Sequence, residues 1–281
     1  MKSLKNKVAA VTGAGSGIGQ ALAINLAKEG CHLALSDVNA KGLKETLQML
    51  KGHSINVTHQ TLDVSDKDAV FAWADKVVEE HGSVNMIFNN AGVALSGTVD
   101  SLSIEDYKWI MDINFWGVIY GTKAFLPYLE QSGEGHIINI SSVFGLTSQP
   151  LMSGYNASKF AVRGFTESLR QDLELTGSNV TTTCIHPGGI KTNIAKSARM
   201  SKSVEAVTGI KQANASTSFE KFFIHTPDRA AKTILKGVKE NARRVLIGVD
   251  AKMLDGMARV LPTGYQWVFT KVVKLQKRFL H

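Results

Sequence analysis

Cysteine is scarce in this chain, with Cys31 and Cys184 the only two among 281 residues. Small secreted domains that depend on disulfides are rich in cysteine, so a disulfide-stabilised scaffold is excluded. Both thiols lie in apolar, strand-like runs far apart in the sequence, and we expect them to be buried and unpaired. These features favour a reducing compartment and predict a cytoplasmic protein.

Long apolar runs and metal-binding patterns are also missing. No run approaches the roughly 18 apolar residues that a membrane-spanning helix needs. Residues 1–7 are polar and lead directly into the first strand, so we expect no signal peptide. Eight histidines are scattered without the paired spacing of metal ligands, which predicts no metal site.

Negative charge is scarce at the C-terminus. The net charge is +8, and residues 251–281 carry six Lys or Arg against the single acid Asp255, a surplus of five. The basic residues are not interleaved with aromatic residues along the rest of the chain, as they are in proteins that read nucleic acids. The composition therefore predicts no nucleic-acid partner.

Strand-like apolar runs alternate with helical segments along the chain. This alternation predicts an α/β fold with a mostly parallel, doubly wound sheet between two layers of helices. We expect one domain over residues 1–250, with a substrate lid at 191–225 and a basic amphipathic extension at 251–281. Strands are expected at 7–12, 32–36, 56–61, 84–88, 135–141, 179–186 and 244–247. Helices are expected at 17–28, 40–51, 67–81 with Ser65 as N-cap, 103–128 with a break near Asp112, 155–174 and 227–240.

Four glycines follow the first expected strand and open the first expected helix. They are Gly13, Gly15, Gly17 and Gly19. Glycine lets a ligand approach the main chain closely, and the N–H groups at a helix N-terminus attract phosphate. Because strand, turn and helix occur in this order, the turn predicts a site for the pyrophosphate of a dinucleotide.

An acid at the end of the second strand indicates which dinucleotide is bound. Asp37 lies 18 residues after Gly19, where a carboxylate can accept hydrogen bonds from ribose hydroxyls and would repel a 2′-phosphate. Ser16, Val38 and Asn39 provide no positive charge to receive that phosphate. NAD is therefore favoured over NADP. Asp63 and Val64, after the third strand, are expected to line the adenine.

A second group of residues carries the chemistry. Tyr155 and Lys159 are four apart on an expected helix, so their side chains share one face. A nearby ammonium favours the phenolate and would allow the tyrosine to exchange a proton near neutral pH. Ser142 ends a strand at the same edge of the sheet, where its hydroxyl can hold a substrate carbonyl.

These motifs occur in the order found in the short-chain dehydrogenase/reductase family, and the chain resembles its short single-domain branch from Lys5 to Gly248. The matching segments are the glycine turn 12–19, the segment 89–92, and the segment 187–192. The resemblance implies a three-layer Rossmann fold with a seven-stranded sheet. It implies hydride transfer between a nicotinamide ring and a carbinol carbon.

The resemblance also assigns residues to the site. It implies a catalytic tetrad of Asn114, Ser142, Tyr155 and Lys159, in which Asn114 disturbs its helix and holds a water in a proton relay. Asn89 would brace the sheet. Together with Asp37, Asp63 and Val64 from the strand ends, it gives the cofactor-binding residues Gly13, Gly15, Ser16, Gly17, Ile18, Gly19, Asn90, Ala91, Gly92, Tyr155, Lys159, Pro187, Gly188, Ile190 and Thr192.

The residues expected around the substrate are mostly apolar. Ser142, Phe144, Met152 and Tyr155 are the substrate residues that we single out. As a set they favour an apolar alcohol, ketone or aldehyde over a sugar. Further expected flanking residues are Val93, Leu95, Val143, Leu146, and, from the lid, Ile194, Ala195, Met200 and Phe219.

The C-terminal extension has an apolar stripe at helical spacing flanked by basic residues. The stripe comprises Tyr265, Val268, Phe269, Val272, Leu275 and Phe279, and the bases are Lys271, Lys274, Lys277 and Arg278. Two interpretations stay open: the helix packs on its own domain or a neighbouring subunit, or it lies peripherally on an anionic membrane. The resemblance further implies a homodimer or homotetramer, built partly from the helices that contain Asn114 and Tyr155.

Two other functions compete with an NAD-dependent alcohol or ketone oxidoreductase. One is a 3-oxoacyl-carrier-protein reductase, because a basic surface attracts an acidic carrier, although Asp37 disfavours the NADP that such biosynthesis usually employs. The other is a non-catalytic dinucleotide-binding regulator. The presence of Ser142, Tyr155 and Lys159 disfavours that second alternative.

Overall fold

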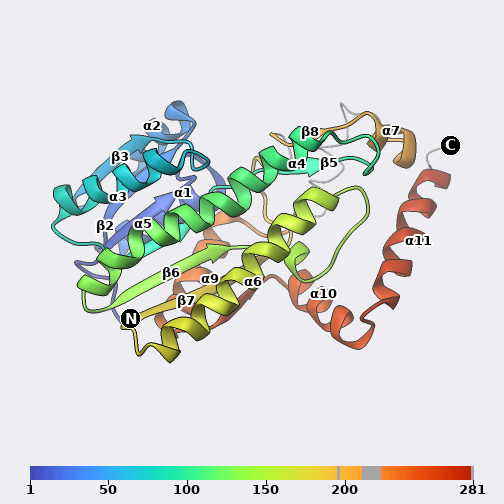
Figure 1. Ribbon diagram of the computed structural model, residues 1–281. Coiled ribbons are helices and arrows are strands. Elements are labelled where there is room, and N and C mark those ends of the chain that lie inside the picture. Colours follow the sequence, from blue (N-terminus) through green and yellow to red (C-terminus); the bar gives the residue numbers. More distant parts are fainter. Residues whose placement is uncertain (195–196, 211–222, 280–281) are drawn as a thin grey trace.

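The computed structural model describes residues 1–194, 197–210 and 223–279 (Figure 1). Its centre is a seven-stranded sheet in the order β3-β2-β1-β4-β6-β7-β9. Each strand pairs in parallel with its neighbours. The strands are β1 (Val8–Thr12), β2 (His32–Asp37), β3 (Val57–Thr61), β4 (Met86–Asn89), β6 (Gly135–Ile140), β7 (Val180–Pro187) and β9 (Arg244–Ile247).

Helices cover both faces of this sheet and complete three layers. One layer contains α1 (Gly17–Lys28), α2 (Ala40–Met49) and α9 (Pro227–Lys239). The other contains α3 (Lys67–His81), α5 (Gly117–Gln131) and α6 (Ser153–Leu175). The Rossmann-type α/β fold predicted from the sequence is confirmed, and the sheet is parallel throughout the described strands.

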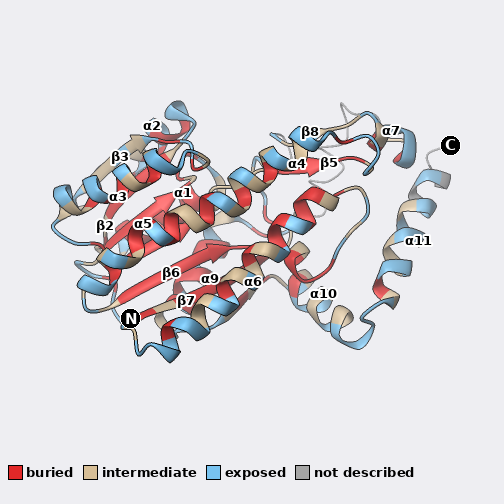
Figure 2. Cartoon of the chain, in the orientation of Figure 1, coloured by how far each residue is buried: buried red, intermediate tan, exposed pale blue. Residues whose placement is uncertain are grey.

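The core consists of two apolar layers, one on each side of the sheet. Leu22 and Leu26 on α1 pack with Ile234 on α9 against one face, and Trp73 on α3 meets Phe125 on α5 over the other. The Trp73 and Phe125 rings touch edge to face with centroids 5.2 Å apart. Figure 2 shows the central strands buried along their length. Burial on both sides explains why strands such as β6 are nearly continuous apolar runs.

The prediction that Ser65 caps α3 was wrong. The cap is Asp66, whose Oδ1 accepts a hydrogen bond from the backbone N–H of Ala69 at 3.0 Å. The Ser65 hydroxyl instead donates to Asp63 Oδ1 at 2.7 Å. Ser65 and Asp66 are both good capping residues. Because the Ser65 side chain is hydrogen-bonded within the turn after β3, Asp66 caps the helix.

The helix interruption expected near Asp112 is a short π-helical segment. The chain runs through α4 (Ile104–Met111), η1 (Asp112–Trp116) and then α5 without leaving its helical path. Ser103 and Asp106 form a capping box at the start of α4. Single π-turns within helices often occur at functional sites, and η1 contains Asn114.

The remaining elements lie around the carboxyl ends of the strands. A 3-10 turn, η2 (Val143–Gly145), follows β6, and a two-stranded sheet pairs β5 (Leu95–Ser96) with β8 (Arg199–Met200). The helix α7 (Ser203–Thr208) follows β8. Residues 195–196 and 211–222 of the expected lid, including Ala195 and Phe219, lie outside the described residues.

The C-terminal extension contains two helices, α10 (Val249–Val260) and α11 (Gly264–Phe279). The sequence predicted only the second. In Figure 1 α11 (red) stands at the far end of the molecule from β2 and β3, beside α7. Among the described residues, no helix is both long and apolar enough to cross a membrane.

Candidate active site

The loops after β1, β2, β4, β6 and β7 surround one cleft at the carboxyl ends of the strands, with a volume of about 1780 Å³. Ligands of doubly wound sheets bind at this edge. Of the catalytic, cofactor-binding and singled-out substrate residues expected from the sequence, all line this cleft except Gly19 and Asn114, which are buried. Folding therefore brings together segments that are up to about 180 residues apart in the chain.

The glycine turn shapes one end of the cleft. Gly13 and Gly17 have φ values of +65° and +54°, in the left-handed region that favours glycine. A β-carbon on Gly13 would lie 2.9 Å from Ala91 Cα, and one on Gly15 would lie 2.8 Å from the Asp37 carboxylate. Because the side chains are absent, the cleft extends to the main chain at the N-terminus of α1. This cradle fits the pyrophosphate of a dinucleotide.

Asp37 stands at the end of β2 beside this turn. Its carboxylate accepts hydrogen bonds from the backbone N–H of Gly15 at 2.7 Å and of Asn39 at 2.8 Å. Its position is thus fixed by the main chain on both sides. The sequence analysis missed Lys41, which lines the same cleft four residues after Asp37 and adds a cation to it.

Asn90 joins the segment after β4 to the glycine turn. Its amide Nδ2 donates to the carbonyl oxygens of Thr12 at 2.9 Å and Gly13 at 3.2 Å. The Thr12 hydroxyl accepts hydrogen bonds from the N–H groups of Asn90 and Ala91. Below them, Asn89 donates to Asn139 Oδ1 at 2.8 Å and so connects β4 with β6.

Ser142, Tyr155 and Lys159 meet at the centre of the cleft. A hydrogen bond from Ser142 reaches the Tyr155 hydroxyl, and Lys159 Nζ lies 5.7 Å from the centre of the Tyr155 ring. The ammonium donates to the carbonyl oxygen of Ile140 at 3.1 Å. All three residues are buried, although no strongly apolar pattern marks them in the sequence.

Burial controls the titration of these groups. It raises the pKa of Tyr155, and the hydrogen bond from Ser142 lowers that pKa by a smaller amount. Burial lowers the pKa of Lys159 to about 8, so the ammonium is still the main form at neutral pH. The sequence analysis expected Lys159 to lower the tyrosine pKa, and that expectation was wrong: the Tyr155 pKa is raised, because desolvation of the phenolate is the largest effect and the only lowering comes from Ser142.

Asn114 is fully buried behind Lys159. It accepts a hydrogen bond from the N–H of Val93 at 2.8 Å and donates to the Val93 carbonyl and to the Ser158 hydroxyl, both at 3.0 Å. A β-carbon on Gly92 would lie 3.2 Å from Asn114 Oδ1 and 3.3 Å from Lys159 Nζ. The absence of that side chain leaves the asparagine and the lysine close to each other.

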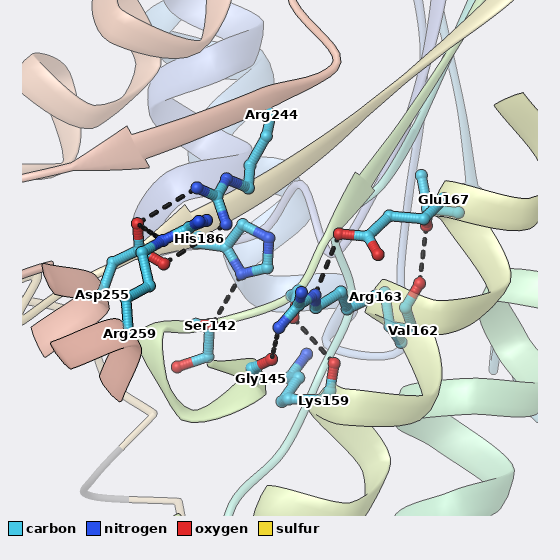
Figure 3. A network of polar contacts seen from close by, with 12 residues as sticks. Ser142, Gly145, Lys159, Val162, Arg163, Glu167, His186, Arg244, Asp255 and Arg259 are labelled. Atoms are coloured by element: carbon cyan, nitrogen blue, oxygen red, sulfur yellow. Dashed lines mark hydrogen bonds and ion pairs between the residues drawn. The ribbon is translucent and has the colours of Figure 1, made fainter. Parts of the chain in front are cut away.

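The sequence analysis missed His186, which supports Ser142 from below. Figure 3 shows the His186 ring pointing at the loop after β6, where Nδ1 lies 2.9 Å from the Ser142 carbonyl oxygen. A carbonyl only accepts, so Nδ1 carries the proton. Burial lowers the pKa of His186 to about 4, which keeps the ring neutral. On the other side of the loop, Arg163 contacts the Gly145 carbonyl and Glu167.

The segment after β7 lines the cleft opposite the glycine turn. Ile190 pairs with His225, and the Thr192 methyl group lies 3.1 Å from where a β-carbon on Gly17 would stand. The N–H of Gly189 donates to Asp250 Oδ2 at 2.6 Å. The sequence analysis missed Asp250, because it lies in α10, beyond every motif.

The expected substrate residues form an apolar patch beside Tyr155. The Phe144 ring contacts the Tyr155 ring edge to face with centroids 6.4 Å apart, and Met152 packs in the same cluster. Val93, Val143, Ile194 and Met200 also line the cleft. Leu95 and Leu146 do not: both are buried, and we count them as core.

The fold and the site define a dinucleotide-binding oxidoreductase. The family described as short chain dehydrogenase matches residues 7–203. A putative oxidoreductase of Mycobacterium tuberculosis, SadH, is 47% identical over 271 residues, which cover 95% of each chain. An uncharacterized oxidoreductase of Listeria monocytogenes, Lmo0432, is 33% identical over 238 residues, which cover 85% of this chain and 92% of that one.

A solved structure agrees with these sequence matches. A short-chain dehydrogenase/reductase from Burkholderia phymatum in complex with NAD has a TM-score of 0.85 and 30% identity, and the match covers 95% of this chain and 97% of that one. The chain belongs to the short-chain dehydrogenase/reductase family. It is a dehydrogenase/reductase that binds a nicotinamide dinucleotide.

Proposed function

We propose that this protein is an NAD-preferring dehydrogenase that acts on an apolar alcohol and, in reverse, on the corresponding ketone or aldehyde. One observation carries the proposal: Ser142, Tyr155 and Lys159 converge at a point where a dinucleotide cradle meets an apolar patch. A bound nicotinamide supplies or accepts the hydride at its C4 position. The protein positions the substrate and the nicotinamide, carries the proton, and stabilises the charge that develops on the substrate oxygen.

Each catalytic residue has a distinct role in this proposal. Ser142 holds the substrate oxygen through its hydroxyl, and Tyr155 takes the alcohol proton during oxidation and returns it to the carbonyl oxygen during reduction. Lys159 binds the nicotinamide ribose and keeps a positive charge near the phenolate. Asn114 holds a water that links Lys159 to solvent. His186 and Arg163 position the Ser142 loop and do not touch the substrate.

The remaining expected residues bind the cofactor. Gly13, Gly15, Ser16, Gly17, Ile18 and Gly19 surround the pyrophosphate, Asp37 holds the adenosine ribose, and Asp63 with Val64 lines the adenine. Asn90, Ala91 and Gly92 pass under that ribose, and Pro187, Gly188, Ile190 and Thr192 hold the nicotinamide. Tyr155 and Lys159 bind the ribose that carries the nicotinamide.

Two observations support NAD over NADP. The Asp37 carboxylate is fixed at the end of β2 by two backbone N–H groups, so a 2′-phosphate would meet a negative charge that cannot turn away. The Burkholderia relative was solved with NAD bound. Lys41 opposes this preference, because its ammonium lines the same end of the cleft.

Replacing Asp37 tests the cofactor preference. In Asp37→Ala we expect kcat/KM with NAD⁺ to fall about 10- to 150-fold, because a hydrogen bond to a charged acceptor contributes about 1.5–3 kcal/mol. With NADP⁺ we expect kcat/KM to rise. The matched control is Lys41→Ala, which should leave the NAD⁺ value unchanged and raise no NADP⁺ activity. An unchanged NAD⁺/NADP⁺ ratio in Asp37→Ala would contradict the assignment.

The substrate class is tested by turnover on graded alcohols. Purified protein is given NAD⁺ and primary and secondary alcohols of increasing chain length, and NADH formation is followed by absorbance. We expect activity that rises with chain length and is greater with NAD⁺ than with NADP⁺. Activity confined to short polar alcohols would contradict the apolar substrate.

The same assay separates the two competing functions. A 3-oxoacyl-carrier-protein reductase would reduce carrier-bound 3-oxoacyl groups with NADPH and leave free alcohols unreacted. A non-catalytic regulator would bind NADH without turnover of any substrate. The buried Ser142–Tyr155 hydrogen bond supports catalysis over regulation.

We also propose a homodimer or homotetramer that uses the outer face of η1, α5 and α6. Trp116 on η1 is 43% exposed and Phe160 on α6 is 37% exposed. Large aromatic residues of this kind are enriched at protein interfaces. Light scattering after gel filtration should show more than one chain per particle, and Trp116→Glu should dissociate it. A monomeric wild-type protein would contradict this.

We propose a cytoplasmic protein that can contact a membrane surface through the outer face of α10 and α11. Cys31 and Cys184 are both free and buried. Val260 is 79% exposed and Trp267 is 65% exposed, and Lys271 Nζ lies 4.5 Å from the Trp267 ring centre. Such a face suits an anionic lipid surface. Sedimentation with phosphatidylglycerol vesicles, compared with phosphatidylcholine vesicles, measures the contact; equal and negligible binding to both would contradict it.

A further inference from the structure

The C-terminal arm, which we define as α10 and α11 over residues 249–279, is tied to the rim of the active-site cleft. Its helices lie beyond the last sheet strand and outside the segment matched by the family, residues 7–203. Among the contacts that attach it, the Gly189 N–H donates to Asp250 Oδ2 at 2.6 Å, and Arg244 pairs with Asp255 at 3.1 Å. The Ser148 N–H donates to Tyr265 Oη at 3.2 Å, and Lys277 Nζ donates to the Ala206 carbonyl at 3.0 Å.

These contacts place the arm across the cleft from the catalytic residues. Gly189 belongs to the nicotinamide segment, and Ser148 belongs to the loop between η2 and α6. Tyr265 is buried, and its ring meets Phe269 edge to face with centroids 5.7 Å apart. The start of α11 is therefore held against the substrate side, which orients one face of the helix toward the cleft.

That face is apolar. Phe269, Val272, Val273 and Leu275 of α11, together with Leu254 of α10, line the same cleft as Ser142 and Tyr155. Met200 and Val204 line it from β8 and α7. From Phe269 to Leu275 the helix advances about 9 Å at 1.5 Å per residue. The cleft therefore continues well past the residues that hold the reacting oxygen.

The size of the cleft also exceeds what a small substrate needs. Ligand sites usually enclose about 300–1000 Å³, whereas this cleft measures about 1780 Å³. A dinucleotide occupies the end that contains the glycine turn. At the far end, Leu275 is 43% exposed among the described residues. An extended chain could enter there and run between α7 and α11 toward Tyr155.

We propose that the C-terminal arm forms the distal wall of a subsite for the aliphatic chain of a long-chain alcohol or ketone, an inference that rests on the proposed function. Continuity of the apolar wall with the Ser142–Tyr155 site favours a substrate chain over any other occupant. Phe269 and Val273 are the specificity-determining residues. Phe269, Val272 and Leu275, which belong to the apolar stripe that the sequence showed in this segment, line the subsite.

The test is the dependence of kcat/KM on chain length for a series of 2-alkanols with the full-length protein and saturating NAD⁺. In the wild type we expect about a fourfold rise for each added methylene, as for burial of a methylene group, until the wall ends. In Phe269→Ala and Val273→Asp we expect the long-chain values to fall at least about tenfold, toward that of the shortest alcohol. The shortest alcohol itself should change less than about twofold, because it reaches only the Ser142–Tyr155 end.

A matched control separates the lining from the helix that carries it. Trp267→Ala removes a larger side chain from the opposite, exposed side of α11 and should leave the chain-length dependence intact. Equal losses on short and long alcohols in Phe269→Ala would overturn the proposal, because they would mean that Phe269 only supports the fold. An unchanged chain-length dependence in both lining variants would overturn it as well.

A binding measurement without turnover keeps this inference separate from the proposed chemistry. A fluorescent long-chain fatty acid is titrated into the protein saturated with NADH. Tight binding in the wild type and at least tenfold weaker binding in Val273→Asp support the subsite even if no alcohol is oxidised. Absence of binding in the wild type would overturn the subsite. A wild-type dimer that Val273→Asp converts to a monomer in light scattering would overturn it too, because this wall would then contact a second copy of the chain.

Discussion

Tyr155→Phe is expected to lower kcat about 10²- to 10⁴-fold while the affinity for NADH stays within a few-fold. The substitution removes only the hydroxyl, which receives the hydrogen bond from Ser142. The ring still packs against Phe144 and Met152, so the cleft keeps its shape. Turnover is measured with saturating alcohol and NAD⁺, and affinity by NADH fluorescence.

The pH profile gives this prediction a second readout. Oxidation needs the phenolate and reduction needs the phenol. Because burial raises the Tyr155 pKa, the phenolate is the minor form at neutral pH. Oxidation should therefore accelerate with rising pH, by about tenfold per unit below that pKa, and reduction should slow above it. Tyr155→Phe should lose this dependence.

The control for Tyr155→Phe is Tyr107→Phe. Tyr107 donates or accepts one hydrogen bond of 2.6 Å with Ser153 at the start of α6, two residues from Tyr155. Its loss disturbs the same helix end without touching the proton path, so we expect kcat to change by less than about fivefold. Full turnover in Tyr155→Phe would contradict the proposed mechanism. It would not contradict the fold or the assignment of the glycine turn to cofactor binding.

Gly19→Ala is expected to weaken dinucleotide binding about 10- to 100-fold. A β-carbon on Gly19 would overlap the carbonyl oxygen of Gly13 and lie 2.6 Å from Asn90 Nδ2. The helix start must move away from the turn, because a backbone carbonyl cannot rotate aside. Overpacking of this kind costs about 1–3 kcal/mol, and here the cost falls on the geometry that holds the pyrophosphate.

Gly164→Ala is the matched control for this substitution. Gly164 also lies in a helix, α6, and a β-carbon there meets nothing within 4 Å. We expect unchanged NADH affinity and a small gain in stability, since alanine is favoured over glycine in helices by about 0.5–1 kcal/mol. Fluorescence titration with NADH measures the affinity, and thermal unfolding measures whether each variant folds. A folded Gly19→Ala protein with wild-type affinity would refute the cradle.

Local sequence was enough to predict the central fold. Most strands of the sheet follow from an apolar run with a turn after it, and Gly13–Gly19 lies where a strand meets a helix. Tyr155 and Lys159 are on one face of α6 because residues four apart in a helix always are. Such inferences need only distances along the chain.

Choices between nearby alternatives were harder to predict. Ser65 and Asp66 are both good helix caps, and the hydrogen bond from Ser65 to Asp63 decided between them. Leu95 and Leu146 follow the same loops as Val93 and Phe144, yet they turn into the core. The direction of the Tyr155 pKa shift was also hard to predict. It depends on burial of the ring by residues from many parts of the chain, and burial of this kind has no local sequence signal.

The sequence by itself determined which chemical groups this protein has and the order of the elements that carry them: a glycine turn before a helix, an acid after the second strand, and a tyrosine and lysine on one helical face. Only the tertiary structure decided what lies against them. It placed His186 under Ser142, Asp250 against Gly189, and the apolar face of α11 along the cleft. An amphipathic stripe shows that a helix has an apolar face, but what covers that face depends on contacts between residues far apart in the chain, which no local pattern encodes.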